Sequence, residues 1–124
     1  MQAAYYALTG AWPIVHMPSF EAVTGPKVDD WLVHVVGLLT VSIAAALWPR
    51  GRREVPPAVR LLALASAASF LVIDVVYATL GVIRPIYLAD AALQAGFLLA
   101  HAALPYPAGA VHPAAGADGS PEGR

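Results

Sequence analysis

Residues 61–82 form a run of apolar and small side chains that is long enough to cross a lipid bilayer, and Asp74 is the one charged residue within it. A helix that spans the hydrocarbon core needs about 20 mostly apolar residues. A carboxylate at that depth costs roughly 2.5–3.5 kcal/mol on insertion scales, so it is kept where it faces a partner, a water-filled cavity or a reaction. Asp74 therefore indicates where a functional site lies.

Three further apolar segments accompany this run, so that the four cover about 3–17 (extending towards 23), 31–48, 58–83 and 85–104. The chain is 59% hydrophobic and 12% charged, whereas a typical soluble domain is about 45–50% apolar and about 25% charged. Pro13 interrupts the first segment, which we expect to be a kinked span or a shallow helix. Short loops favour antiparallel neighbours. The sequence predicts an all-α protein, an integral membrane four-helix bundle of up-down topology over residues 1–104.

Basic residues are unevenly divided between the two ends of the predicted bundle. The second loop region holds Arg50, Arg52, Arg53 and Arg60, whereas the opposite side has Lys27 and Arg84. Short basic loops stay in the cytoplasm, which predicts a multi-pass protein of the cell membrane with both termini cytoplasmic. Residues 105–124 are rich in Pro, Gly and Ala, and we expect a disordered cytoplasmic tail. The first segment lacks a basic start and is predicted to be a retained helix rather than a signal peptide.

Charge and motif content argue against several classes of protein. The net charge of −1 gives no basic excess for nucleic acid. The chain has no cysteine, which excludes disulfides, thiol redox chemistry and Cys-ligated metal. It contains no H-E-x-x-H, no nucleophile elbow and no phosphate loop. Histidines and carboxylates have no diagnostic metal-ligand spacing, so we predict no metal site, and the cofactor, if any, is unknown.

Each predicted helix carries polar side chains at helical spacing. Lipid tails cannot satisfy such groups, so the stripes should point into the bundle. Their members are Tyr5, Thr9, Trp12 and His16 in the first helix, Asp30, His34 and Gly37 in the second, Asp74, Tyr77, Gly81 and Arg84 in the third, and Asp90, Gln94, Phe97 and His101 in the fourth.

A rise of about 1.5 Å per residue places most of these groups in the outer half of the bundle. This predicts a polar pocket that opens outward with Asp74 near its floor, and it leaves His101 apart in the inner half. Structural roles remain open: Asp74 as a packing contact, Arg84 in an ion pair with Asp90 or Glu21, and His16 as a helix cap. The predicted site residues are His16, Glu21, His34, Asp74, Tyr77, Arg84, Asp90 and Gln94.

Residues 6–48 resemble the small four-helix membrane proteins of the DoxX-like group. The likeness lies in a small-residue first helix with a proline, a short loop with Phe20 and Gly25, and the run Val33-x-x-x-Gly37-Leu38. The resemblance implies a four-helix bundle in a bacterial inner membrane. The activities of that group are mostly undefined, so no site residue is transferred from it.

Three functions fit this pattern, with the lipid bilayer as the common partner. The first is the binding of a small lipophilic molecule, or of a membrane partner such as a second copy, with Tyr77, Asp90, Gln94, Glu21 and Arg84 as the binding residues. The second is an enzyme in which Asp74 is the base and His34 or His16 the acid. The third is a proton-coupled transporter, which would require a dimer. In a fourth interpretation, Asp74 only stabilises the bundle.

Overall fold

The computed structural model describes residues 1–49 and 55–104, and these ranges contain five α-helices and no strand. The prediction of an all-α protein is confirmed. The predicted disordered tail, residues 105–124, and the basic residues Arg50, Arg52 and Arg53 lie outside the described residues. The helices are α1 (Gln2–Val15), α2 (Met17–Thr24), α3 (Asp30–Leu47), α4 (Pro57–Thr79) and α5 (Tyr87–Ala103).

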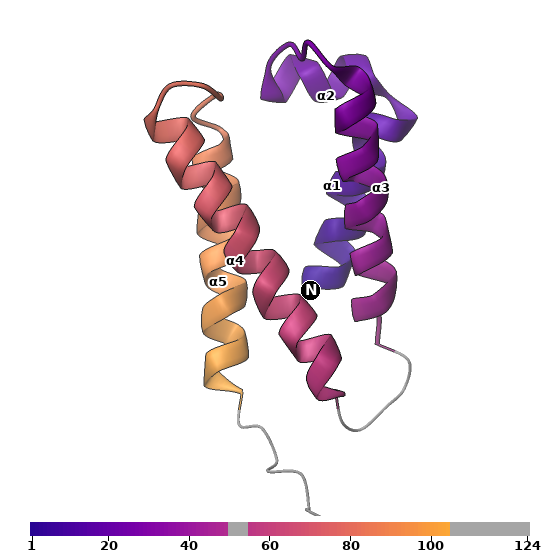
Figure 1. The fold of residues 1–124 in the computed structure, drawn as a ribbon, viewed down its shortest axis with the longest axis vertical. Coiled ribbons are helices and arrows are strands. Elements are labelled where there is room, and N and C mark those ends of the chain that lie inside the picture. The colour runs from indigo at the N-terminus through magenta and orange to yellow at the C-terminus, as the bar shows by residue number, and fades with distance from the viewer. Residues whose placement is uncertain (50–54, 105–124) are drawn as a thin grey trace, which may run out of the picture.

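The four longer helices alternate in direction, as the short loops predict (Figure 1). Helix α1 packs along α3, and α4 packs along α5. These two pairs meet at the lower end of the molecule and diverge at the upper end, where the short α2 lies above α1 (Figure 1). The divergence leaves room between the pairs at that end.

The first apolar segment was predicted to form a kinked span or a shallow helix, and the structure divides it into two helices instead. Helix α1 ends at Val15, two residues after Pro13, and His16 leaves helical geometry with φ −152° and ψ 81°. Proline removes a backbone donor from a helix interior and is favoured in the first turn of a new one. Pro13 therefore weakens the end of α1, and Pro18 favours the start of α2.

The third apolar segment ends earlier than predicted. Helix α4 stops at Thr79, and the chain then turns at Gly81, whose φ of +71° is unfavourable for other residues. Gly81 and Arg84 are therefore not part of the α4 stripe, and they lie in the loop before α5.

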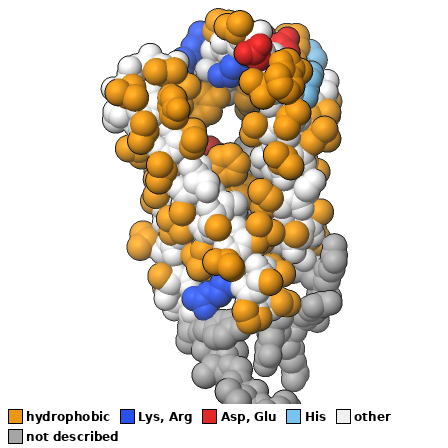
Figure 2. Space-filling model, in the orientation of Figure 1, with side chains coloured by type: hydrophobic (Ala, Val, Ile, Leu, Met, Phe, Trp, Pro, Cys, Tyr) orange, Lys and Arg blue, Asp and Glu red, His pale blue; other side chains and the backbone are white. Residues whose placement is uncertain are grey.

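Small and polar side chains fill the interior, whereas most large aliphatic ones face outward. The buried apolar residues are mainly alanines, such as Ala44, Ala63 and Ala67, together with Tyr6. Figure 2 shows apolar side chains over the middle of the visible face and most of its charged side chains gathered near the upper and lower ends. This distribution is the reverse of that expected for a domain folded in water.

Two glycines set the close approach of α1 and α3. A Cβ atom on Gly37 would lie 2.6 Å from the Gly10 carbonyl oxygen, and one on Gly10 would lie 2.8 Å from the Gly37 carbonyl oxygen. Small residues allow such contact between helix backbones, as membrane helices often require. By contrast, a Cβ atom on Gly96 would meet no neighbour within 4 Å. Gly10 and Gly37 thus allow the two helices to touch, whereas Gly96 lies beside open space.

We expect Gly37→Ala to destabilise the protein by about 1–3 kcal/mol, because the new methyl group forces α1 and α3 apart. The matched control is Gly96→Ala, which adds the same methyl group to open space and should be neutral or stabilise α5 by up to about 1 kcal/mol. Thermal unfolding of both variants in detergent measures the difference. Equal melting temperatures for the two variants would contradict the glycine contact.

Candidate functional site

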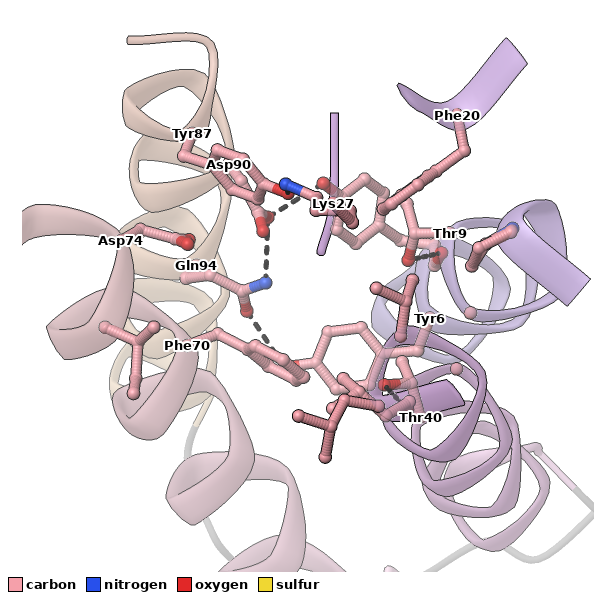
Figure 3. A pocket seen from close by; sticks show the side chains of 18 residues that line it. Tyr6, Thr9, Phe20, Lys27, Thr40, Phe70, Asp74, Tyr87, Asp90 and Gln94 are labelled. Atoms are coloured by element: carbon pink, nitrogen blue, oxygen red, sulfur yellow. Dashed lines mark hydrogen bonds between the residues drawn. The ribbon is translucent and has the colours of Figure 1, made fainter. Parts of the chain in front are cut away.

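A cavity of about 320 Å³ lies between the two helix pairs at the end where they diverge (Figure 3). Its volume falls at the lower end of the range typical of small-molecule sites, about 300–1,000 Å³. Apolar side chains make up most of its wall. The lining residues are Tyr5, Tyr6, Thr9, Gly10, Pro13, Phe20, Lys27, Leu32, Val33, Val36, Gly37, Thr40, Phe70, Ile73, Asp74, Tyr87, Asp90 and Gln94.

Asp90 is held by two donors inside this cavity. Oδ1 of its carboxylate accepts a hydrogen bond of 2.8 Å from the Tyr5 hydroxyl and one of 3.0 Å from the Gln94 side-chain amide. Hydrogen bonds to an ionised group are the stronger kind and stabilise its charge. The first turn of α5, where Asp90 lies, also favours a negative charge. These two hydrogen bonds fix the orientation of the Asp90 side chain in the cavity.

The hydrogen bonds continue from Gln94 towards the lower end of the bundle. The Tyr6 hydroxyl donates to Gln94 Oε1 at 2.8 Å and accepts from Gln2 Nε2 at 3.2 Å. Gln2 Nε2 also donates to the Ala63 carbonyl at 2.9 Å, and Gln2 Oε1 lies 2.9 Å from His101 Nε2. Because an amide oxygen can only accept, Nε2 of His101 is the donor. We call this series of contacts from Asp90 to His101 the polar chain; it joins α1 to both α4 and α5.

Asp74 lies beside the polar chain, but one of its oxygens has no partner. The side chain is 3% exposed, and Oδ2 is buried with no hydrogen bond among the residues that the structure describes. Figure 3 shows its carboxyl group pointing from α4 towards Gln94 and Asp90, and its neighbouring charged group is Asp90. An unsatisfied buried polar atom costs about 1–3 kcal/mol. Asp74 thus lines a mostly apolar cavity and has one buried carboxyl oxygen without a partner.

Aromatic rings form much of the wall near this acceptor. The ring centroids of Tyr6 and Phe70 lie 5.4 Å apart in an edge-to-face arrangement, and those of Tyr5 and Phe97 lie 5.8 Å apart. The hydroxyls of two other lining residues, Thr9 and Thr40, donate to carbonyls of their own helices. These threonines are therefore satisfied locally, and their hydroxyl protons are not available to a ligand.

Two cationic side chains connect the helix pairs across the upper end of the cavity. Lys27 Nζ donates a hydrogen bond of 3.2 Å to the Tyr87 hydroxyl and lies 5.2 Å from the centre of the Tyr87 ring. Arg84 donates to the Ala22 carbonyl at 3.1 Å. The Glu21 carboxylate accepts from the Lys27 backbone N–H at 2.7 Å and so orders the loop. We call these contacts the roof.

The structure places only part of the predicted site at the cavity. Asp74, Asp90 and Gln94 line it together, as the stripes of the third and fourth segments predict. Glu21 and Arg84 belong to the roof, where Arg84 binds a carbonyl rather than either predicted carboxylate. His16 acts as a cap, since its Nδ1 accepts from the Ser19 backbone N–H at 3.2 Å. Neither His34 nor Tyr77 lines the cavity, and Tyr77 is 43% exposed.

Several residues of the site were missed. Tyr6 was placed in none of the polar stripes, yet it is 1% exposed and donates to Gln94, and Tyr5, a member of the first stripe, was not among the predicted site residues although it donates to Asp90. The inward face of α1 is the one with Ala3, Tyr6, Gly10 and Pro13, one position away from most of the predicted stripe. Their spacing of three, four and three residues, all small or aromatic, was the available signal.

The cavity opens to the side as well as lying beneath the roof. In the space-filling view a gap separates the two helix pairs below the upper end, and acidic atoms are visible at its edge (Figure 2). Its flanks carry apolar side chains.

We expect Tyr6→Phe to destabilise the protein by about 1–3 kcal/mol, because it leaves the buried Gln94 Oε1 without its donor. Tyr77→Phe is the matched control, since the Tyr77 side chain is largely exposed and lies outside the polar chain. Denaturant or thermal unfolding of both variants gives the comparison. A Tyr6→Phe variant as stable as Tyr77→Phe would show that the polar chain does not hold the helix pairs together.

No family model, curated protein or solved structure is significantly similar to this chain. The resemblance to the DoxX-like group therefore stays a prediction, and the function has to be argued from the cavity itself.

Proposed function

We propose that this chain is a multi-pass integral membrane protein that binds a small lipophilic molecule in the cavity between its two helix pairs. The proposal has two parts, the membrane location and the binding, and they rest on different observations. The helices would form an up-down bundle whose roof faces outward and whose basic second loop faces the cytoplasm.

The outward-facing apolar surface supports the membrane location. Helices α3 and α4 are long and apolar enough to cross a bilayer, a test that the core helix of a soluble protein also passes. A core helix, however, is mostly buried, whereas only 17% of α3 and 22% of an 18-residue stretch of α4 are buried. In water this would expose an apolar area far larger than soluble monomers tolerate.

Helix α1 contributes to the bundle without matching the full thickness of a bilayer. Its 14 residues extend about 21 Å at 1.5 Å per residue, against about 30 Å for the hydrocarbon core. Helix α2 continues from its upper end at the level of the charged roof. In the proposed arrangement α2 lies at the outer interface, and the membrane is thinned locally beside α1.

One observation carries the binding proposal: a preformed cavity with apolar walls contains a buried, unpartnered carboxyl oxygen on Asp74. Specific small-molecule sites combine mainly apolar walls with a few directed polar groups. The enzymatic alternative is less favoured, because no histidine among the described residues lines the cavity to serve as the acid. No contact in the described ranges specifically supports the dimeric transporter.

The absence of cysteine makes the membrane orientation directly testable. We expect Val28→Cys, in the roof loop, to react in intact cells with a maleimide that cannot cross membranes. Val55→Cys, before α4, should react only after permeabilisation, because the positive-inside rule places it in the cytoplasm. Both native valines are exposed, and the cysteine-free parent is the blank. Labelling of both sites from outside, or neither, would contradict the orientation.

A cavity-filling variant tests the binding. Val33 lines the cavity, whereas Val35 on the same helix does not and is 43% exposed. We expect small lipophilic molecules to co-purify with the wild-type protein and with Val35→Phe, and to be lost from Val33→Phe, whose added ring occupies part of the cavity. Mass spectrometry of solvent extracts measures this. Equal retention by the two phenylalanine variants, or none by the wild type, would overturn the proposal.

A further inference from the structure

We infer that the cavity selects molecules with an apolar body and a single positive charge, and that Asp74 and Asp90 together hold the cationic group. This inference rests on the proposed binding function and narrows its ligand to one chemical class, the lipophilic ammonium ions.

Two acidic side chains, Asp74 and Asp90, already line the cavity. Asp90 receives hydrogen bonds from Tyr5 and Gln94, two neutral donors that stabilise its carboxylate without neutralising it. Asp74 lies against it from α4, nearly fully buried. A buried negative charge requires a positive partner or a proton. Two carboxyl groups therefore lie side by side at the cavity, and a cation that enters can supply the positive partner.

The one basic side chain among the described residues that line the cavity makes its hydrogen bonds to groups other than the two carboxyls. Among the described residues that line the cavity, Lys27 is the one Lys, Arg or His. Its ammonium group donates to the Tyr87 hydroxyl and, at 3.4 Å, to the Thr24 carbonyl. Asp74 Oδ2 meanwhile has no partner in the part of the chain that the structure describes. Lys27 therefore makes no hydrogen bond to Asp74, the carboxyl group that still has an unpartnered oxygen.

The rings of Tyr5, Tyr6, Phe20, Phe70 and Tyr87 line the cavity. Aromatic faces attract cations, most strongly where water is excluded, and cages of aromatic rings recognise alkylated ammonium groups. Apolar walls also suit the rest of a lipophilic molecule. A carboxyl pair inside an aromatic cavity therefore matches an organic cation in both charge and surface.

Other ligand classes fit less well. Anions would be repelled by the two carboxyl groups. A divalent metal ion needs more ligands, and no cluster of three or more His, Cys, Asp or Glu suitable for a metal occurs in the described ranges. A neutral lipophilic molecule such as a quinone would fill the apolar volume without placing a positive charge beside the acidic pair, and binding of a neutral molecule is one outcome that the test distinguishes.

The test compares two probes of nearly equal shape, benzyltrimethylammonium and its uncharged isostere neopentylbenzene, by calorimetric titration of the full chain in nanodiscs of zwitterionic lipid. Empty nanodiscs correct for partitioning into lipid. We expect wild-type protein to bind the cation at least about tenfold more tightly than the isostere, a difference of about 1.4 kcal/mol. This comparison requires no variant, so it holds even if changes at Asp74 impair folding.

Two variants then assign the selectivity to the carboxyl group. Asp74→Asn should remove the preference for the cation and leave binding of the isostere unchanged. Asp74→Glu should retain the preference for the cation. Equal binding of both probes by the wild type, or an unaltered preference in a folded Asp74→Asn protein, would overturn the inference while the binding function stands. Val33→Phe should weaken the binding of both probes. If neither probe binds wild-type protein above the lipid background, the proposed binding function itself is wrong.

Discussion

The polar chain from Asp90 to His101 is the interaction on which the rest of this structure depends. The helix pair α1–α3 and the pair α4–α5 are each packed along their length and are in less extensive contact with one another, where the rings of Tyr5 and Tyr6 meet Phe70 and Phe97. Gln2, Tyr6 and Gln94 join the pairs through hydrogen bonds that have little competition from water. In an apolar surrounding such bonds are costly to break, because the separated groups find no replacement partner. They set the distance between the pairs, and with it the existence of the cavity.

The fourth apolar segment shows how far the sequence alone can lead. Asp90, Gln94, Phe97 and His101 were predicted to share one inward face, and each of them contacts the interior from α5. The prediction succeeded because polar groups on a mostly apolar helix find hydrogen-bond partners only on the side that faces other helices. Asp74 was correctly predicted to face the interior for the same reason. Its unpartnered oxygen is compatible with a structural role and with a functional one.

The first segment shows why the rest was not predictable. Tyrosine is typical of both membrane interfaces and buried hydrogen-bonding sites, so its position alone could not identify Tyr6 as a buried donor. The break at His16 depends on two prolines acting together, and the rotation of α1 depends on the contact between Gly10 and Gly37 across two helices. The histidines His16 and His34 were grouped with Asp74 by depth, but depth gives no information on which way a side chain points around its helix.

The glycine contact between α1 and α3 has a mechanical consequence. Because these two backbones touch, that pair behaves as one solid half of the molecule, and α4 with α5 forms the other. The halves are joined below by Gln2, midway by Tyr5 and Tyr6, and above by Lys27 and Arg84. A change in cavity width therefore does not need to deform any helix. It can occur as a swing of one half about the lower joint, and the two cationic links at the upper end are the contacts that such a swing would break first.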